Sequence, residues 1–207
     1  PQGAEKQLID AITGRQVPSG GLPMDVGCLV QNVGTAAAIY EAVALKKPLV
    51  ERVVSVTGPG VNNPANFLAR LGTPFSDLIE AAGNYTTSAS KLINGGPMMG
   101  ISQHTDDVPV IKGTSGILVL DEAMTEHMEI RPCISCAKCV DICPMKLIPS
   151  HIAAFIEAGN IDQAESLGLM DCMECGSCSF ICPAKKELLQ TIKLGKALLQ
   201  DKKNKAS

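Results

Sequence analysis

Two cysteine blocks with the same spacing constrain this chain more than any other feature. Each block reads CxxCxxCxxxCP, and together they hold all but one of the 9 cysteines. This spacing is typical of paired [4Fe–4S] clusters, in which three close thiolates bind one cluster and the fourth cysteine binds the other. The pattern predicts two crossed ligand sets: Cys133, Cys136, Cys139 and Cys182 for cluster 1, and Cys172, Cys175, Cys178 and Cys143 for cluster 2.

Other uses of these cysteines fit the spacing poorly. Two duplicated, tightly spaced blocks are a poor loop-closing scheme for disulfides, which also need an oxidising compartment. A zinc site prefers paired CxxC knuckles and has no use for the terminal CxxxCP element. Two clusters also imply a reducing compartment, because their assembly needs free thiols. The ninth cysteine, Cys28, lies in the apolar run GCLV and is expected to be a small buried hydrophobic residue.

Two clusters ligated entirely by cysteine favour electron transfer over catalysis at iron. Full cysteine ligation leaves no open coordination position for a substrate, so each cluster is expected to pass single electrons between other centres. A docking module with structural clusters is an alternative from a different class of protein. Clusters that never change oxidation state in an accessible range would favour that alternative.

The composition narrows the remaining classes. The chain has 207 residues, of which 45% are hydrophobic, so it is long enough for two or three small domains with a core. Its net charge of −3 lacks the basic footprint of a nucleic-acid-binding protein. We find neither an apolar run long enough to span a membrane nor a signal peptide. The chain starts at Pro1 without an initiator Met, which suggests a fragment whose upstream part holds some of the mechanism.

Sequence texture predicts an α+β multidomain fold with four segments. Residues 1–48 form a partial α/β domain, and residues 49–112 carry short β-type runs, VPVIKG among them, around a helix near PFSDLIEAA. Residues 113–130 are expected to be a return segment or linker. Residues 131–207 show helical spacing around the cysteines, with Ser150 as an N-cap and with Gly159 and Asn160 as a stop. This last segment is therefore expected to be an α-helical domain that holds both clusters.

Polar residues outside the cysteine blocks are weaker candidates. QNVGT places Gln31, Asn32 and Thr35 at the start of a predicted helix, where backbone N–H groups can face a phosphate or a polar ring edge. A simply capped helix is the alternative. The GPG run at 58–60 is expected to be a turn rather than a dinucleotide motif, because no third glycine follows. His104 and His127 are expected to be ordinary surface residues.

The motifs before the cysteines resemble one family in order and across essentially the whole chain. GAEKQLI, GRQVPSGGLPMDVG, QNVGTAAAIYEAV, ERVVSVTGPGVNNP and GTSGILVLDE, followed by the doubled cysteine block, resemble the C subunits of Rnf electron-transport complexes. The resemblance implies three parts: a flavin domain similar to that of the respiratory complex I flavoprotein, a β-grasp domain of the soluble-ligand-binding type, and a two-cluster domain. FMN and NAD(H) would bind the first part in the intact protein.

The resemblance also suggests flavin-site residues. Asn32 and Thr35 match the family's flavin-contacting segment, with Gln31 as a neighbour, and Glu5 matches the acidic loop beside flavin and nicotinamide. The Gly-rich flavin loop of the family is absent from this sequence. We therefore expect these residues not to bind FMN or NADH by themselves.

The resemblance implies a role in a membrane complex. The chain would relay electrons between an FMN/NAD(H) site and a partner iron–sulfur subunit of an ion-pumping ferredoxin:NAD oxidoreductase, peripherally on the cytoplasmic face of the membrane. The expected partners are the ferredoxin-like B subunit and the membrane subunits. A cobalamin reductase of microcompartments is the alternative within related families. The lysine-rich C-terminal helix is expected to be a solvated face, with an acidic partner or anionic lipid as the alternative.

Overall fold

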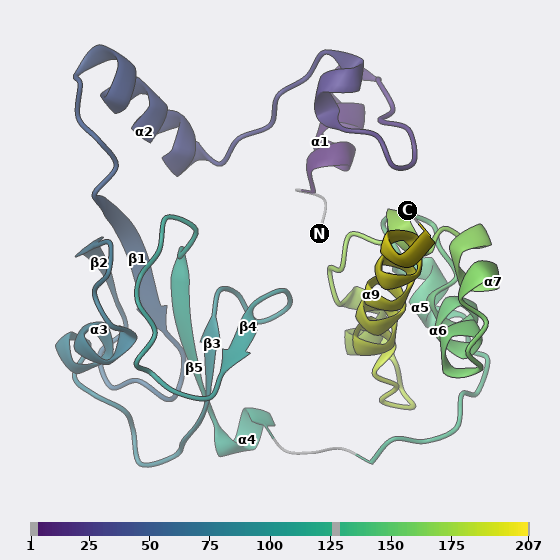
Figure 1. The fold of residues 1–207 in the computed structure, drawn as a ribbon. Coiled ribbons are helices and arrows are strands. Elements are labelled where there is room, and N and C mark those ends of the chain that lie inside the picture. The colour runs from purple at the N-terminus through teal and green to yellow at the C-terminus, as the bar shows by residue number, and fades with distance from the viewer. Residues whose placement is uncertain (1–3, 126–128, 207) are drawn as a thin grey trace. The chain divides into compact units, whose positions relative to one another are not determined.

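The chain forms two compact units, which are described separately (Figure 1). The computed structural model describes residues 4–125 and 129–206. Residues 31–127 form a sheet unit, whereas residues 1–30 join residues 128–207 in a helical unit. The expected first domain, residues 1–48, is thus divided between the two units after residue 30. The mixed α/β fold class is confirmed at this coarse level.

The sheet unit is built on five strands in the order β2-β1-β5-β3-β4. Strands β1 and β5 pair in parallel, and the other neighbours pair antiparallel. One helix, α3, packs its buried residues into the core of this unit. The bounds are β1 Glu51–Thr57, β2 Ala65–Arg70, α3 Phe75–Ala81, β3 Ala89–Asn94, β4 Ile101–Gln103, β5 Gly116–Asp121 and α4 Glu122–Thr125.

Alternation along β1 sets which face of the sheet is buried. Val54 and Val56 are buried, while Val53, directly before them, is 63% exposed. The inward valines pack with residues of β5 and with the α3 residues Phe75 and Ile79 in one cluster. Gly58 follows β1 with φ +113°, and a Cβ there would lie 2.1 Å from Val119 O. The GPG run is therefore a turn, as predicted, and only glycine fits at its start.

Two expectations for the sheet unit differ from the structure. Residues 113–130 are not only a linker, because the run ILVL within them forms most of β5, the central strand. A short apolar run of this kind suits a strand that is buried on both faces. The run VPVIKG is wrong as a strand: it forms a loop whose Val110 is buried and donates its N–H to Thr73 O at 2.8 Å. The helix predicted near residues 74–82 is confirmed as α3.

The N-terminal part of the sheet unit is helix α2, Val33–Ala44. Asn32 is its N-cap, and the side-chain oxygen of Asn32 accepts a hydrogen bond from Gly34 N at 2.9 Å. The predicted helix start at QNVGT is therefore confirmed. None of the residues of α2 is buried in the described structure.

The helical unit places short helices around both cysteine blocks. Its largest core cluster contains Ile152 and Ile156 of α6 together with Ile192 and Leu199 of α9. The bounds are α1 Glu5–Thr13, η1 Pro23–Val26, α5 Lys138–Asp141, α6 Pro149–Glu157, α7 Ile161–Ser166, η2 Leu169–Asp171, α8 Ser177–Ile181 and α9 Leu188–Ala206.

Local capping in the helical unit differs in part from the sequence prediction. Ser150 is not the N-cap of α6, because Pro149 occupies the first helical position and Ile148 precedes it. Proline suits that position, since its missing N–H has no helical acceptor there. The stop of α6 predicted at Gly159 and Asn160 is confirmed, since Gly159 has φ +75° and Asn160 N donates to Phe155 O at 2.8 Å, and Asn160 also caps α7 by accepting from Gln163 N at 3.3 Å. Cys28 is half-buried rather than buried, with Sγ 3.7 Å from Val26 O.

Candidate iron–sulfur centres

The two cysteine blocks fold as an internal repeat. Block 2 follows block 1 at a distance of 39 residues, from Cys133 to Cys172. The same distance separates the first residue of α5 from that of α8, and the first residue of α6 from that of α9. Each repeat is therefore a cysteine loop, a short helix, a Cys-Pro turn and a longer helix.

Backbone conformation repeats with the same period. Left-handed residues with positive φ occur at three equivalent pairs of positions: Ser135 and Glu174, Ala137 and Gly176, Lys146 and Lys185. Such residues turn the chain tightly and direct backbone N–H groups inward. Two backbone N–H groups lie near thiol sulfurs of block 1, with Ser135 N 3.5 Å from Cys133 Sγ and Leu147 N 3.4 Å from Cys143 Sγ.

The eight cysteines line two separate cavities. In each cavity, three cysteines come from one block and the fourth comes from the other block. Backbone pairing accompanies this exchange, since Arg131 N, just before block 1, donates to Ala184 O, just after block 2, at 2.9 Å. The cavities are lined by Cys133, Cys136, Cys139 and Cys182 (cavity 1), and by Cys143, Cys172, Cys175 and Cys178 (cavity 2).

The donor sets fit cubane clusters better than single metal ions. Among residues 4–125 and 129–206, no group of three or more His, Cys, Asp or Glu side chains converges as a site for one ion. A [4Fe–4S] cluster needs no such convergence, because each of its four irons takes one thiolate. Apolar residues complete both cavities, including Ala153 and Leu188 in cavity 1 and Leu189 and Ile192 in cavity 2.

The two cavities differ in access to water. Cavity 1 has a volume of about 220 Å³, and its Cys133 and Cys136 are exposed. Cavity 2 is narrower, at about 20 Å³, and its Cys175 and Cys178 are each only 8% exposed. Cavity 2 is therefore the better shielded of the two.

Burial also changes the acidity of the thiols in cavity 2. It raises the pKa of Cys172, against the opposing effects of a backbone hydrogen bond and of the Lys196 ammonium. Burial raises the pKa of Cys178 to about 11. Since only thiolates bind iron, binding at these cysteines must release protons.

Lys196 of α9 is the charged side chain most closely tied to cavity 2. Its Nζ donates to Cys172 O at 2.6 Å and to Glu174 Oε1 at 2.8 Å, and its side chain is 18% exposed. Lys193 Nζ lies 3.9 Å from the other oxygen of Glu174. Sequence reasoning placed Lys196 only within a lysine-rich helix. The 39-residue repeat could have indicated that Lys196 lies near cavity 2. It relates α9 to α6, so α9 is expected to pack against block 2 as α6 packs against block 1.

Residues 4–30 of the helical unit contact the surroundings of cavity 2. Gln7 Nε2 donates to Pro144 O at 2.7 Å, directly after Cys143, and Gln7 Oε1 is buried without a hydrogen-bond partner in the described residues. Ser19 Oγ donates to Asp171 Oδ1 at 2.6 Å, directly before Cys172. The two contacts attach this segment beside two of the predicted cluster 2 ligands.

The predicted flavin residues belong to different units. Glu5 is the exposed first residue of α1 in the helical unit, whereas Asn32 and Thr35 belong to the start of α2 in the sheet unit. Asn32 is exposed and already caps α2, and Thr35 is half-buried. A shared site for these residues is therefore not defined by either unit.

The sheet unit contains an open polar cavity of about 490 Å³ between its β3–β4 region and neighbouring loops. Tyr85 Oη donates to Asp106 Oδ2 at 3.0 Å at this cavity. Burial, with help from Asp106, raises the pKa of Tyr85 to about 12, so the phenol stays protonated as a donor. His104 lines the same cavity and is exposed, as predicted, while His127 lies outside the described residues.

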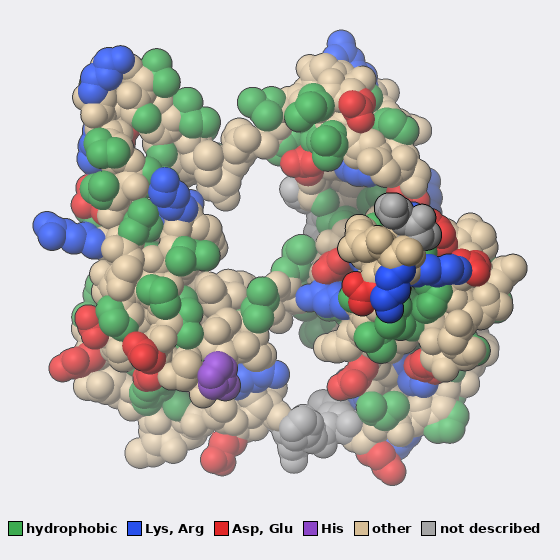
Figure 2. Space-filling view, in the orientation of Figure 1, with side chains coloured by type: hydrophobic (Ala, Val, Ile, Leu, Met, Phe, Trp, Pro, Cys, Tyr) green, Lys and Arg blue, Asp and Glu red, His purple; other side chains and the backbone are tan. Residues whose placement is uncertain are grey.

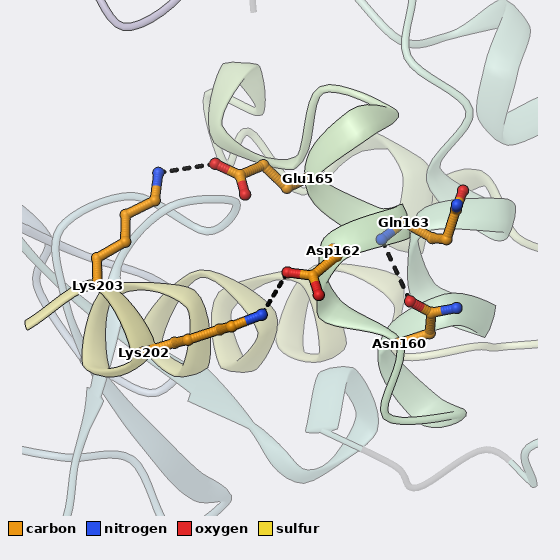
Figure 3. A network of polar contacts seen from close by, with 6 residues as sticks. All are labelled: Asn160, Asp162, Gln163, Glu165, Lys202 and Lys203. Carbon is orange, nitrogen blue, oxygen red and sulfur yellow. Dashed lines mark hydrogen bonds and ion pairs between the residues drawn. The ribbon is translucent and has the colours of Figure 1, made fainter. Parts of the chain in front are cut away.

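Lysines of the C-terminal region are largely paired within their own unit. Lys202 and Lys203 reach from α9 to Asp162 and Glu165 of α7, beside the Asn160 cap (Figure 3). Lys186 pairs with Glu157, and Lys193 and Lys196 pair with Glu174. Figure 2 shows the resulting mixture of basic and acidic side chains on this unit. These pairings favour the predicted solvated face over a basic docking surface.

Across the described residues, no helix is both long and apolar enough to cross a membrane.

Comparison with protein families assigns a domain type to three parts of the chain. Residues 1–41 match a Nuo51 FMN-binding domain, residues 53–102 match an SLBB domain, and residues 132–186 match a 4Fe-4S dicluster domain. The predicted cofactor classes, two [4Fe–4S] clusters and a flavin, are therefore confirmed at the level of domain type. These matches and the two cysteine-lined cavities define the class of protein: a multidomain chain that combines FMN-binding, SLBB and 4Fe-4S dicluster domain types.

Within this class, the chain is a homologue of the C subunits of ion-translocating ferredoxin:NAD oxidoreductase complexes, which confirms the resemblance. It is 50% identical over 95% of its length to the C subunit of the Na(+)-translocating ferredoxin:NAD(+) oxidoreductase complex of Acetobacterium woodii. It is 48% identical over 93% of its length to the C subunit of the proton-translocating complex of Clostridium ljungdahlii, and 44% identical over 99% to that of the ion-translocating oxidoreductase complex of Rhodobacter capsulatus. The chain spans 44%, 42% and 40% of these relatives.

The two most similar of these three relatives carry different ions in their names. One is named for Na⁺ and the other for protons, although their identities to this chain differ by only two percentage points. Similarity in this region therefore does not select the coupling ion. All three relatives are named as subunits of a larger complex.

Proposed function

We propose that this chain is the electron-relaying part of the C subunit of an ion-translocating ferredoxin:NAD oxidoreductase. The observation that carries the proposal is the pair of cavities, each lined by four cysteines in the crossed arrangement of a dicluster domain. Electrons would pass singly between an FMN/NAD(H) site and a partner iron–sulfur subunit. The domain limits 49–112 and 131–207 that the sequence predicts remain part of this proposal.

The residues of the chain would hold the clusters and keep water away from them. Cys133, Cys136, Cys139 and Cys182 would bind cluster 1, and Cys143, Cys172, Cys175 and Cys178 would bind cluster 2. [4Fe–4S] clusters, when bound, supply one-electron carriers whose potentials depend on hydrogen bonds and exposure. Backbone N–H groups near sulfur and the apolar lining of both cavities provide these two controls.

The flavin side of the reaction would involve the residues that match the FMN-binding domain. Glu5, Asn32 and Thr35 are the proposed contacts to FMN or NAD(H) in the intact protein, since all three lie within the matched residues 1–41. FMN, when bound, exchanges electrons between a two-electron hydride donor and one-electron carriers. The proposed partners are a ferredoxin-like B subunit and membrane subunits, with the chain lying peripherally on the cytoplasmic face.

Iron analysis of cysteine variants tests the crossed ligation. Anaerobically prepared protein is expected to hold about eight iron and eight sulfide per chain. Cys136→Ser and Cys182→Ser are each expected to lose cluster 1, although they lie in different blocks, and the double variant is expected to lose no more than either alone. Combining Cys136→Ser with Cys175→Ser should remove both clusters, and Cys28→Ser is the matched control that should keep full iron.

Two results would count against the proposal. If the Cys136→Ser, Cys182→Ser double variant lost all iron, each block would hold its own cluster and the crossed arrangement would be wrong. If the unaltered chain held a single zinc in place of iron and sulfide, the relay itself would be wrong. Electron paramagnetic resonance (EPR) during a redox titration is expected to show both clusters changing oxidation state, which structural clusters would not do.

A further inference from the structure

The two cluster sites have the same ligands but opposite charges at one repeated position. A shift of 39 residues superimposes the start of α6 on the start of α9, and it relates Glu157 to Lys196. Glu157 lines cavity 1, and Lys196 donates to the carbonyl of Cys172, a residue that lines cavity 2. The repeat thus places an anion beside one site and a cation beside the other.

The cation at cavity 2 is well placed to act on that site. The Lys196 side chain is 18% exposed, and its Nζ lies 2.6 Å from Cys172 O. Glu174 is its ion-pair partner, but Lys193 lies against the same carboxylate, so the three side chains carry a net positive charge. Cys175 and Cys178 are buried, which limits screening by water around this site.

The anion at cavity 1 is more exposed. The Glu157 side chain is 51% exposed, and its Oε1 lies 3.6 Å from Lys186 Nζ, which lines the same cavity. This pair is neutral overall, and Cys133 and Cys136 beside it are open to water. Glu157 is therefore expected to make the electrostatic potential at cavity 1 more negative, whereas Lys196 makes that at cavity 2 more positive. The effect of Glu157 is expected to be the weaker of the two.

We propose that Lys196 is a redox-tuning residue that raises the midpoint potential of cluster 2, and that Glu157 at the equivalent position lowers that of cluster 1. This inference rests on the proposed function, because it needs clusters at both cavities. The pair of residues would separate the potentials of two sites whose thiolate ligands are identical in number and spacing.

The physical reason is the charge that reduction adds. Each reduction places one more negative charge on a cluster, so a nearby cation stabilises the reduced form and a nearby anion destabilises it. Net charge, hydrogen bonds to the ligands and exposure are the factors that set such potentials. Lys196 supplies a charge and a hydrogen bond to a ligand residue from a position that is mostly shielded from water.

A redox titration of the cluster-loaded chain, followed by EPR, tests the inference. Lys196→Gln is expected to shift one of the two transitions to lower potential, by about a tenfold change in its equilibrium, or about 59 mV for one electron. Glu157→Gln is expected to shift the other transition upward by less. Lys202→Gln is the matched control, since Lys202 lies on the same helix and pairs with Asp162, and neither residue lines a cavity that holds the cysteines.

Two further variants keep the test sharp if Lys196→Gln binds its cluster poorly. Lys196→Arg retains the charge and should retain the potential. Glu174→Gln removes the anion that offsets Lys196 and should move the cluster 2 transition upward, opposite to Lys196→Gln. The inference is overturned if Lys196→Gln shifts neither transition beyond the control, or if Lys196→Gln and Glu157→Gln act on the same transition.

Iron and sulfide content separates this test from that of the relay. Loaded protein whose transitions ignore Lys196 would leave the proposed function standing and remove only the tuning. Protein without iron and sulfide would remove the proposed function itself.

Discussion

Backbone conformation at single residues shapes the cysteine loops. Ala137 and Gly176 occupy the same position in the two repeats, and both have positive φ, at +58° and +77°. A left-handed conformation costs an L-residue about 1–2 kcal/mol, whereas glycine adopts it freely. At this one position block 1 therefore carries strain that block 2 avoids, although Glu174 and Lys185 adopt the same left-handed conformation elsewhere in block 2.

Exchange of these two residues should reveal that strain. Ala137→Gly is expected to increase the free energy of unfolding by about 1 kcal/mol, and Gly176→Ala to decrease it by about 1–2 kcal/mol. Urea denaturation of cluster-loaded protein under anaerobic conditions measures both changes. A destabilising Ala137→Gly would show that the strain at this position is compensated elsewhere in the loop.

Packing between α6 and α9 joins the two repeats at the element scale. Gly195 of α9 and Ile156 of α6 are 39 residues apart, so they occupy the same position in their repeats. A Cβ at Gly195 would lie 2.4 Å from Ile156 Cδ1 and 2.7 Å from Ile156 Cγ1. Equivalent positions thus meet where the two helices cross, and with Ile156 on α6 there is no room for a side chain at position 195.

Substitution at this crossing should separate packing from helix propensity. Gly195→Ala gains about 1 kcal/mol of helix propensity but is expected to destabilise the unit by about 1–3 kcal/mol through overpacking, for a net loss. Ile156→Ala alone is expected to cost about 2–5 kcal/mol because Ile156 is buried, but Gly195→Ala should cost less in the Ile156→Ala background, a coupling that a double-mutant cycle of unfolding free energies measures. Leu194→Ala, at an exposed neighbour, is the control. Strict additivity of the two substitutions would contradict close contact between the helices.

The two units of the molecule carry different groups: the cluster cysteines lie in one unit and the tyrosines in the other. All eight block cysteines lie in the helical unit, and the core of the sheet unit contains none of them. Both tyrosines of the chain, Tyr40 and Tyr85, lie in the sheet unit, and the chain has no tryptophan. Tyrosine fluorescence therefore reports on the sheet unit alone.

Iron removal is expected to destabilise one unit selectively. Chelation should lower the midpoint of the thermal transition seen by far-ultraviolet circular dichroism, because cluster binding contributes to folding of the helical unit. The midpoint seen by tyrosine fluorescence should stay unchanged. Equal shifts of both signals would mean that the two units unfold as one.

The features that could be predicted from the sequence are those that depend on residues close together in the chain. The cysteine spacing predicted two cluster sites, and the cysteines that line each cavity are those of one predicted ligand set. Capping predicted the start of α2, and helical spacing predicted the helical character of residues 131–207, in which α6 and α9 lie. The start of α6 was misplaced because Pro149 and Ser150 both suit a helix start, and the choice between them depends on how the chain leaves the Cys-Pro turn.

Sequence alone determined the doubled cysteine block and, with it, the prediction of two cluster sites with cysteine ligands, because both depend on residue identity and spacing. Only the tertiary structure decided that ILVL lies at the centre of the sheet, since a short apolar run pairs with whichever strands the topology brings beside it. The same holds for Lys196. Its charge is visible in the sequence. The proposed effect of that charge on the midpoint potential of cluster 2 depends on the distance from Lys196 Nζ to Cys172 O and on shielding from water, and both arise only when α9 packs against block 2.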